Sequence, residues 1–274
     1  MISSQNTTPT SASKCIYLGT EASDLSKQFT EINEKWISSI AVFYYVEGAL
    51  YELVEDYECV GPKVRIEHNV KTPTVEYCCQ KMTKVPGELV SLEEGKENNV
   101  IAGYRYRSEA CWEGEELYSL LNKMVSQVLI NSIKLMTPYT HVTSQSGIEY
   151  LLAVLSDGKG YLIEGEENKI VVPISKALFS LHTHPNNCLL SPHDVRSLSN
   201  TLMYRGIGGG VISRDCYLIL VRSGPFTEDD LMDLMKFRNA LRKMKVDDLN
   251  HYLKRGFIGT SLRIHTNYFH ISQL

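Results

Sequence analysis

The stretch from Leu181 to Asp194 constrains the fold more than any other part of the chain, because it joins a strand pattern to a helix start. His182 and His184 lie two residues apart, and side chains at this spacing on a strand point to the same face. Ser191 and Asp194, with a proline between them, fit the N-cap and first turn of a helix. The sequence therefore predicts a strand delivering two imidazoles, a short loop, and a helix delivering a carboxylate.

Two imidazoles and one carboxylate form a ligand set suited to catalytic zinc, which uses three protein ligands and leaves a fourth position for water. We therefore predict that His182, His184 and Asp194 bind one zinc ion per chain. A His-x-His pair is common by chance and a Ser-Pro-x-Asp run is by itself a good helix cap, so the prediction rests on their combination. His251, His265 and His270 have no ligand spacing. His193 lies between ligand-type residues but is expected to point away from the face of Asp194, so it is not included.

The run H-T-H-P…S-P-H-D resembles the H-x-H-P…S-x-x-D signature of the JAMM (MPN+) zinc isopeptidases. Six residues separate His184 from Ser191, where the family pattern has seven, so the intervening loop is one residue shorter. The resemblance covers roughly residues 115–225. It implies an α+β or α/β fold of the JAMM type, similar to cytidine deaminases, in which helices flank a mixed β-sheet.

The same family uses a glutamate at the head of a strand as its general base, and Glu149 opens an apolar run here. The resemblance implies that Glu149 takes a proton from the zinc-activated water. It also implies that the Ser191 hydroxyl helps to hold the developing oxyanion, beside its competing role as a helix cap.

The substrates implied by the resemblance are isopeptide bonds that join ubiquitin or a ubiquitin-like protein to its target. His182 follows Glu149 by only 33 positions, which leaves little room for the segments that select ubiquitin chains, so a simpler ubiquitin-like modifier is at least as plausible. Two other classes stay open: a zinc hydrolase of a small-molecule amide, and a non-catalytic scaffold or binding module. The intact Glu/His/His/Asp set favours the enzyme.

The composition is that of an ordinary globular protein, with 43% hydrophobic and 22% charged residues among 274. The net charge of −4 and scattered basic residues give no expectation of nucleic-acid binding. We expect no signal peptide, and no apolar run of membrane-spanning length, and therefore no membrane partner. Seven cysteines without a repeating framework suggest reduced thiols in the cytoplasm, with Cys78, Cys79 and Cys188 buried by packing. The oligomeric state is left open.

The first part of the chain carries no chemical signature. We expect a disordered tail over residues 1–14 and a β-rich accessory domain of unassigned role over residues 15–110. Within it we expect a helix over Asp24–Trp36 and a loop over Glu88–Asn98. Strands are expected at Cys15–Leu18, Ser39–Val46, Leu50–Val54, Lys63–Glu67, Thr74–Cys79 and Val100–Arg107.

Residues 111–274 are assigned to the zinc hydrolase domain with a helical C-terminal extension. Its clearest helix is Glu115–Met136, where apolar residues recur at three- and four-residue steps and Pro138 is expected to end the helix. Ile207–Gly210 is interpreted as a close-packed turn. Further helices are expected at Pro192–Met203, Thr227–Met244 and Asp247–Lys254. Strands are expected at Glu149–Leu155, Tyr161–Ile163, Ile170–Ile174, Ala177–Leu181, Val211–Ser213, Cys216–Val221 and Leu262–Ile271.

Overall fold

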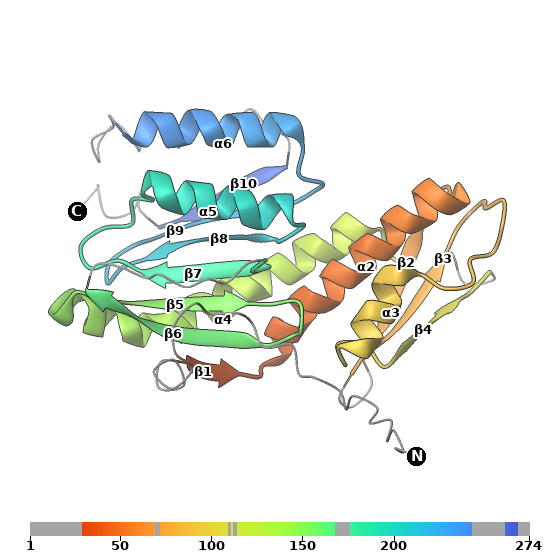
Figure 1. Ribbon diagram of the computed structural model, residues 1–274, viewed down its shortest axis with the longest axis horizontal. Coiled ribbons are helices and arrows are strands. Elements are labelled where there is room, and N and C mark those ends of the chain that lie inside the picture. Colours follow the sequence, from red (N-terminus) through yellow and green to blue (C-terminus); the bar gives the residue numbers. More distant parts are fainter. Residues whose placement is uncertain are drawn as a thin grey trace, which may run out of the picture.

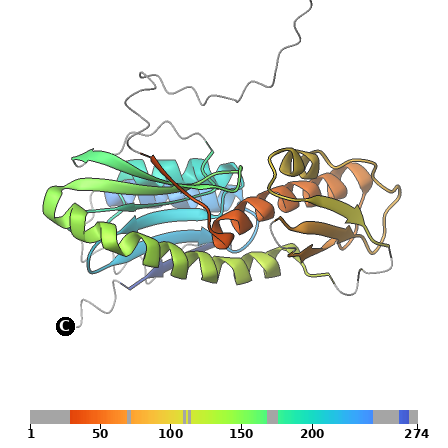
Figure 2. The same cartoon turned by 90° about the horizontal axis from the view of Figure 1, so that it is seen from below.

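The computed structural model describes residues 29–68, 72–108, 111, 114–167, 176–242 and 261–267. Within these residues the protein is a mixed α+β structure with a seven-stranded and a three-stranded sheet, which lie side by side (Figure 1). Two long helices, α2 (Lys35–Tyr57) and α4 (Leu117–Ser146), extend from the large sheet to the small one (Figure 2).

The large sheet has the strand order β1-β6-β5-β7-β8-β9-β10. Only β7 and β8 pair in parallel among its described strands, and the other neighbours are antiparallel. Strand β1 comes from the part of the chain before the expected domain boundary near residue 110, and the other six strands come from the part after it. This sheet therefore combines strands from both sides of that boundary. The strands are β1 (Phe29–Ile32), β5 (Ile148–Val154), β6 (Gly160–Glu167), β7 (Phe179–Thr183), β8 (Gly208–Ile212), β9 (Tyr217–Arg222) and β10 (Leu262–Thr266).

Helices cover both faces of the large sheet (Figures 1 and 2). Helix α4 packs on β5, β7 and β8 from one side. Helix α5 (Pro192–Met203) packs on β8 from the other side, and α6 (Glu228–Leu241) packs on α5. A separate apolar cluster fills the space beneath α5 and α6. The predictions of α5, α6 and the strands around the histidines are confirmed, apart from shifts of a few residues at their ends.

The small sheet consists of β2 (Lys63–Glu67), β3 (Thr74–Cys78) and β4 (Gly103–Tyr106), as the sequence predicts. The predicted loop over Glu88–Asn98 is wrong, because it contains helix α3 (Val90–Glu97). The Glu52 carboxylate accepts hydrogen bonds from the Val90 and Ser91 amides at 2.7 and 2.8 Å. A residue of α2 therefore satisfies the first amides of α3, which no local sequence signal reveals.

Helix α2 replaces the predicted strands Ser39–Val46 and Leu50–Val54. The predicted helix Asp24–Trp36 is wrong over its described residues, because Phe29–Ile32 form strand β1 and α2 begins only at Lys35. Thirteen of its residues are buried, on every side of the helix, so its sequence shows no alternation between an apolar and a polar face. With two helices, the region is less β-rich than expected.

Helix α2 contradicts the expectation that no apolar run reaches membrane-spanning length, because it is long and apolar enough by length and composition alone. Its most apolar window has a mean hydropathy of 1.3, but 67% of that window is buried inside the protein. Such burial is typical of the core helix of a folded domain, and α2 fills that position between the two sheets.

Helix α4 continues through Pro138 to Ser146, so the predicted end at Met136 is wrong. A proline inside a helix removes one hydrogen bond and costs about 3 kcal/mol. Beyond the proline, the helix buries Thr140 and Thr143. This packing against the sheet holds the last turns in place, and Gly147 then ends the helix in a left-handed conformation.

The run Gly208–Gly210 forms the start of β8 rather than the predicted turn. At each of these three positions a Cβ atom would collide with the backbone of β7 or β9, so only glycine fits. Four predicted segments lie wholly outside the described residues: the tail 1–14, Cys15–Leu18, Ile170–Ile174 and Asp247–Lys254.

The prediction of reduced thiols is wrong, because the described cysteines are paired. Disulfides are typical of proteins in oxidising environments, so the sequence argument for the cytoplasm loses its support. The adjacent pair Cys78 and Cys79 points to opposite sides and has different partners. The disulfides are Cys59–Cys79, Cys78–Cys111 and Cys188–Cys216.

Candidate metal centre

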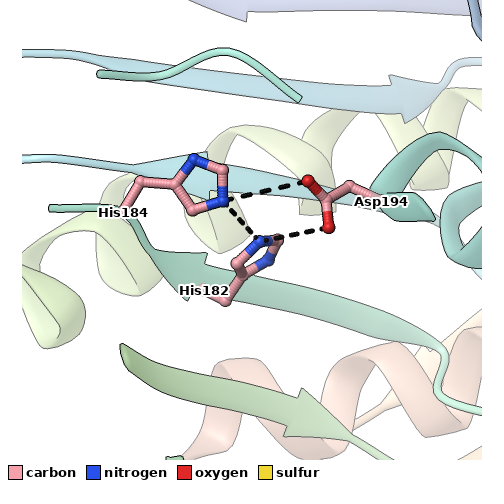
Figure 3. Close-up of side chains that lie close together, drawn as sticks. All are labelled: His182, His184 and Asp194. Atoms are coloured by element: carbon pink, nitrogen blue, oxygen red, sulfur yellow. Dashed lines mark hydrogen bonds and ion pairs between the residues drawn. The ribbon is translucent and has the colours of Figure 1, made fainter. Parts of the chain in front are cut away.

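The end of β7 presents two imidazoles on the same side of the sheet (Figure 3). The Nε2 atoms of His182 and His184 are 3.0 Å apart, and the two rings meet edge to face. The His184 amide donates to the Ile212 carbonyl at 2.8 Å, which continues the β7–β8 pairing past the end of the strand. Both histidines are therefore held by the backbone of the parallel strand pair.

Asp194 approaches the two rings from the start of α5 (Figure 3). The Ser191 amide donates to its Oδ2 atom at 2.6 Å, and the Asp194 amide donates to the Ser191 hydroxyl at 3.2 Å. This reciprocal cap fixes the carboxylate, whose Oδ1 lies 3.4 Å from His182 Nε2. Its Oδ2 lies 3.8 Å from His184 Nε2. The predicted N-cap and first-turn acid of α5 are thus confirmed.

The spacing of these atoms fits a tetrahedral zinc site. Ligands about 2.0–2.2 Å from a tetrahedral zinc lie roughly 3.3 Å from each other. The two Nε2 atoms are 3.0 Å apart, and the 3.4 and 3.8 Å contacts of Asp194 involve different carboxylate oxygens. With one atom taken from each residue, the three ligand atoms lie within 4.8 Å of one another. The side chains are only 15–17% exposed, so the cluster is sheltered but not fully buried. His182, His184 and Asp194 are the set among the described residues with metal-ligand spacing.

Burial keeps both imidazoles neutral. It lowers the pKa of His182 to about 4, with the Asp194 carboxylate acting in the opposite direction. The pKa of His184 is also lowered, chiefly by burial. Hydrogen bonds with the backbones of Gly210 and Asn187 orient the two rings. Neutral, oriented imidazoles are the form that binds a metal ion.

Glu149 lies on the strand next to the histidines. In the antiparallel pairing of β5 with β7, Leu151 faces His182, and continuing this register places Glu149 opposite His184. Burial, and then the charge of Asp194, raise the pKa of Glu149 to about 7. The effect of the Asp194 charge indicates that Glu149 lies near the candidate ligands, and its raised pKa suits proton transfer near neutral pH.

Two threonines that sequence reasoning missed lie behind the histidines. The hydroxyl groups of Thr183 and Thr143 are 2.7 Å apart and fully buried between β7 and α4. The Tyr150 amide also donates to the Thr183 hydroxyl, at 2.8 Å. This chain of hydrogen bonds fastens the His-Thr-His segment to α4 and to the strand of Glu149. No sequence signal links residues 40 positions apart in this way.

Ser191 has one of its two predicted roles in the structure, the helix cap. Its hydroxyl oxygen accepts from the Asp194 amide, so its own proton is left to donate outward. His193 is exposed on α5, and His265 lies on the distant strand β10. His251 and His270 lie outside the described residues.

No protein-family model, curated protein or solved structure matches the chain.

Proposed function

We propose that the protein is a zinc-dependent isopeptidase of the JAMM type, which hydrolyses the amide between a ubiquitin-like modifier and its target. The observation that carries this proposal is the convergence of His182, His184 and Asp194, whose ligand atoms, one from each residue, lie within 4.8 Å of one another. Glu149 lies on the neighbouring strand. The choice of substrate rests on the motif resemblance.

His182, His184 and Asp194 would hold the zinc ion. Zinc in such a site supplies a Lewis acid that polarises a carbonyl and lowers the pKa of water to about 7. Glu149 takes a proton from the attacking water and later passes it to the leaving lysine amine. Its pKa of about 7 suits both steps, because the group exchanges protons readily at neutral pH.

The Ser191 hydroxyl supports the scissile carbonyl in this scheme. Its oxygen accepts from the Asp194 amide at the start of the helix, which leaves its proton to donate to the oxygen that gains charge. The connection between β5 and β6 is short and leaves little room for segments that select ubiquitin chains, so a simpler modifier is at least as plausible a substrate.

Hydrolysis of amides attached to the C-terminal tails of ubiquitin and ubiquitin-like modifiers tests the proposal. Glu149→Gln should keep zinc and fold but lower the rate about 10²–10⁴-fold, because only general-base catalysis is lost. His265→Ala removes a half-buried histidine far from the cluster and should act like the wild type. Wild-type turnover by zinc-loaded Glu149→Gln would contradict the assignment. Cleavage of small amides alone, or conjugate binding without cleavage, would favour the hydrolase or scaffold alternatives.

A further inference from the structure

The loop between the histidines and Asp194 is cross-linked to the rest of the sheet. Cys188, in the middle of this loop, forms a disulfide with Cys216. Cys188 is fully buried, and Cys216 is 7% exposed. Cys216 is the residue just before β9, and its carbonyl accepts a hydrogen bond from the Ser213 amide at 2.8 Å. The disulfide therefore ties the loop to the turn between β8 and β9.

Each cysteine of this disulfide is connected through neighbouring residues to the proposed zinc ligands. On one side, β8 ends at Ile212, whose carbonyl holds the His184 amide. On the other side, Leu190 and Val195 are buried with Cys188 in the apolar cluster beneath α5. Asp194 lies between these two anchors, at the start of the helix. The disulfide thus fixes the helix that carries the carboxylate relative to the strand that carries the imidazoles.

We propose that the Cys188–Cys216 disulfide is a positioning element of the metal site and that its reduction weakens zinc binding. This inference takes the three zinc ligands from the proposed function. Reduction consumes two electrons and two protons from a dithiol or phosphine reductant and yields two thiols, while the reductant is oxidised. Without the cross-link, part of the free energy of metal binding is used to order the loop and bring Asp194 to the histidines. Loss of an outer contact that orients metal ligands typically weakens metal binding about 10–100-fold.

Zinc dissociation constants, measured on the full chain by competition with a chromophoric chelator, test the inference. The Cys188→Ser/Cys216→Ser variant should bind zinc about 10–100-fold more weakly than the oxidised wild type. The matched control is Cys59→Ser/Cys79→Ser, which removes a disulfide beside the small sheet. It should lose thermal stability but keep zinc affinity within about threefold, because it does not touch the ligands.

Reversible reduction provides a second arm in case the serine variant does not fold. Phosphine treatment of the wild type should weaken zinc binding, and reoxidation should restore it. The visible spectrum of the cobalt-substituted protein should change in parallel, since it reports the ligand geometry. Equal affinity in a folded serine variant, or tighter binding after reduction because a free thiol becomes a ligand, would overturn the inference. An oxidised wild type that binds no zinc would instead remove the proposed function.

Discussion

Glu149, the proposed general base, carries a cost to stability, since its raised pKa means that the folded protein opposes its ionisation. Between pH 4.5 and about 7 the folded state holds a proton that the unfolded chain has released. The stability of the metal-free protein therefore falls as pH rises through this window, as far as Glu149 contributes. His182 and His184 act in the opposite sense, because their pKa values are lowered.

Glu149→Gln should isolate this contribution. The variant has no proton to lose, so its stability relative to the wild type should increase from about pH 4.5 to about pH 7, and the histidines cancel in the comparison. Urea unfolding of both proteins, with a chelator present at pH 5 and 7.5, measures the difference. A difference that stays constant or shrinks with pH would show that Glu149 is not buried beside Asp194.

Thr183 gives a second prediction at the scale of single residues. Thr183→Val keeps the shape but leaves the Tyr150 amide and the Thr143 hydroxyl without this partner, which should cost about 1–3 kcal/mol. Thr183→Ser should recover most of this loss. Thr140→Val is the control, because that buried hydroxyl bonds only a carbonyl of its own helix. Denaturant unfolding compares all three, and equal losses in Thr183→Val and Thr140→Val would contradict the assigned network.

At the scale of elements, local pattern predicts structure where one face of an element is apolar. Helix α5 begins and ends at the predicted residues, because Ser191, Pro192 and Asp194 mark its start. Helices α2 and α3 could not be predicted from local sequence pattern, for different reasons. Helix α2 is buried all round, and α3 is capped by Glu52 from another helix. The convergence of His182, His184 and Asp194 could likewise be predicted from their spacing, whereas the neighbouring disulfide and threonine pair depend on contacts between distant segments.

Helix α4 allows a test of how tertiary packing overrides a helix breaker. Pro138 is exposed, so Pro138→Ala restores an amide donor without disturbing the core. We expect the free energy of unfolding to rise by about 1–3 kcal/mol, less the small gain that proline gives by restricting the unfolded chain. Val142→Ala, an exposed change on the same helix, should shift it by no more than about 0.5 kcal/mol. A destabilised Pro138→Ala protein in thermal or urea unfolding would contradict this account.

At the scale of the whole molecule, a buried ion pair joins α2 to the end of β9. Both oxygens of the Glu47 carboxylate accept from the Arg222 guanidinium at 2.6 Å, and the two side chains are at most 1% exposed. The Arg222 guanidinium also donates to the Gly206 carbonyl at 2.7 Å. The pair thus joins the helix that reaches the small sheet to the large sheet.

Breaking one half of this pair should be severe. Glu47→Ala leaves the Arg222 charge buried without its partner and should cost about 3–5 kcal/mol. The double change Glu47→Met/Arg222→Met should cost less, because no charge stays behind. Lys123→Ala, which breaks the exposed pair with Glu115, should cost no more than about 1 kcal/mol. Chemical unfolding measures the free energy of unfolding of each variant. A small loss in Glu47→Ala would show that the pair does not join the two parts.

The central claim is that His182, His184 and Asp194 bind zinc, and metal content tests it most directly. After dialysis against trace zinc, elemental analysis of the wild type and of His265→Ala should find about one zinc per chain, as a three-ligand site implies. The folded double variant His182→Ala/His184→Ala should contain none. A wild type without zinc, or stoichiometric zinc in the double variant, would contradict the account.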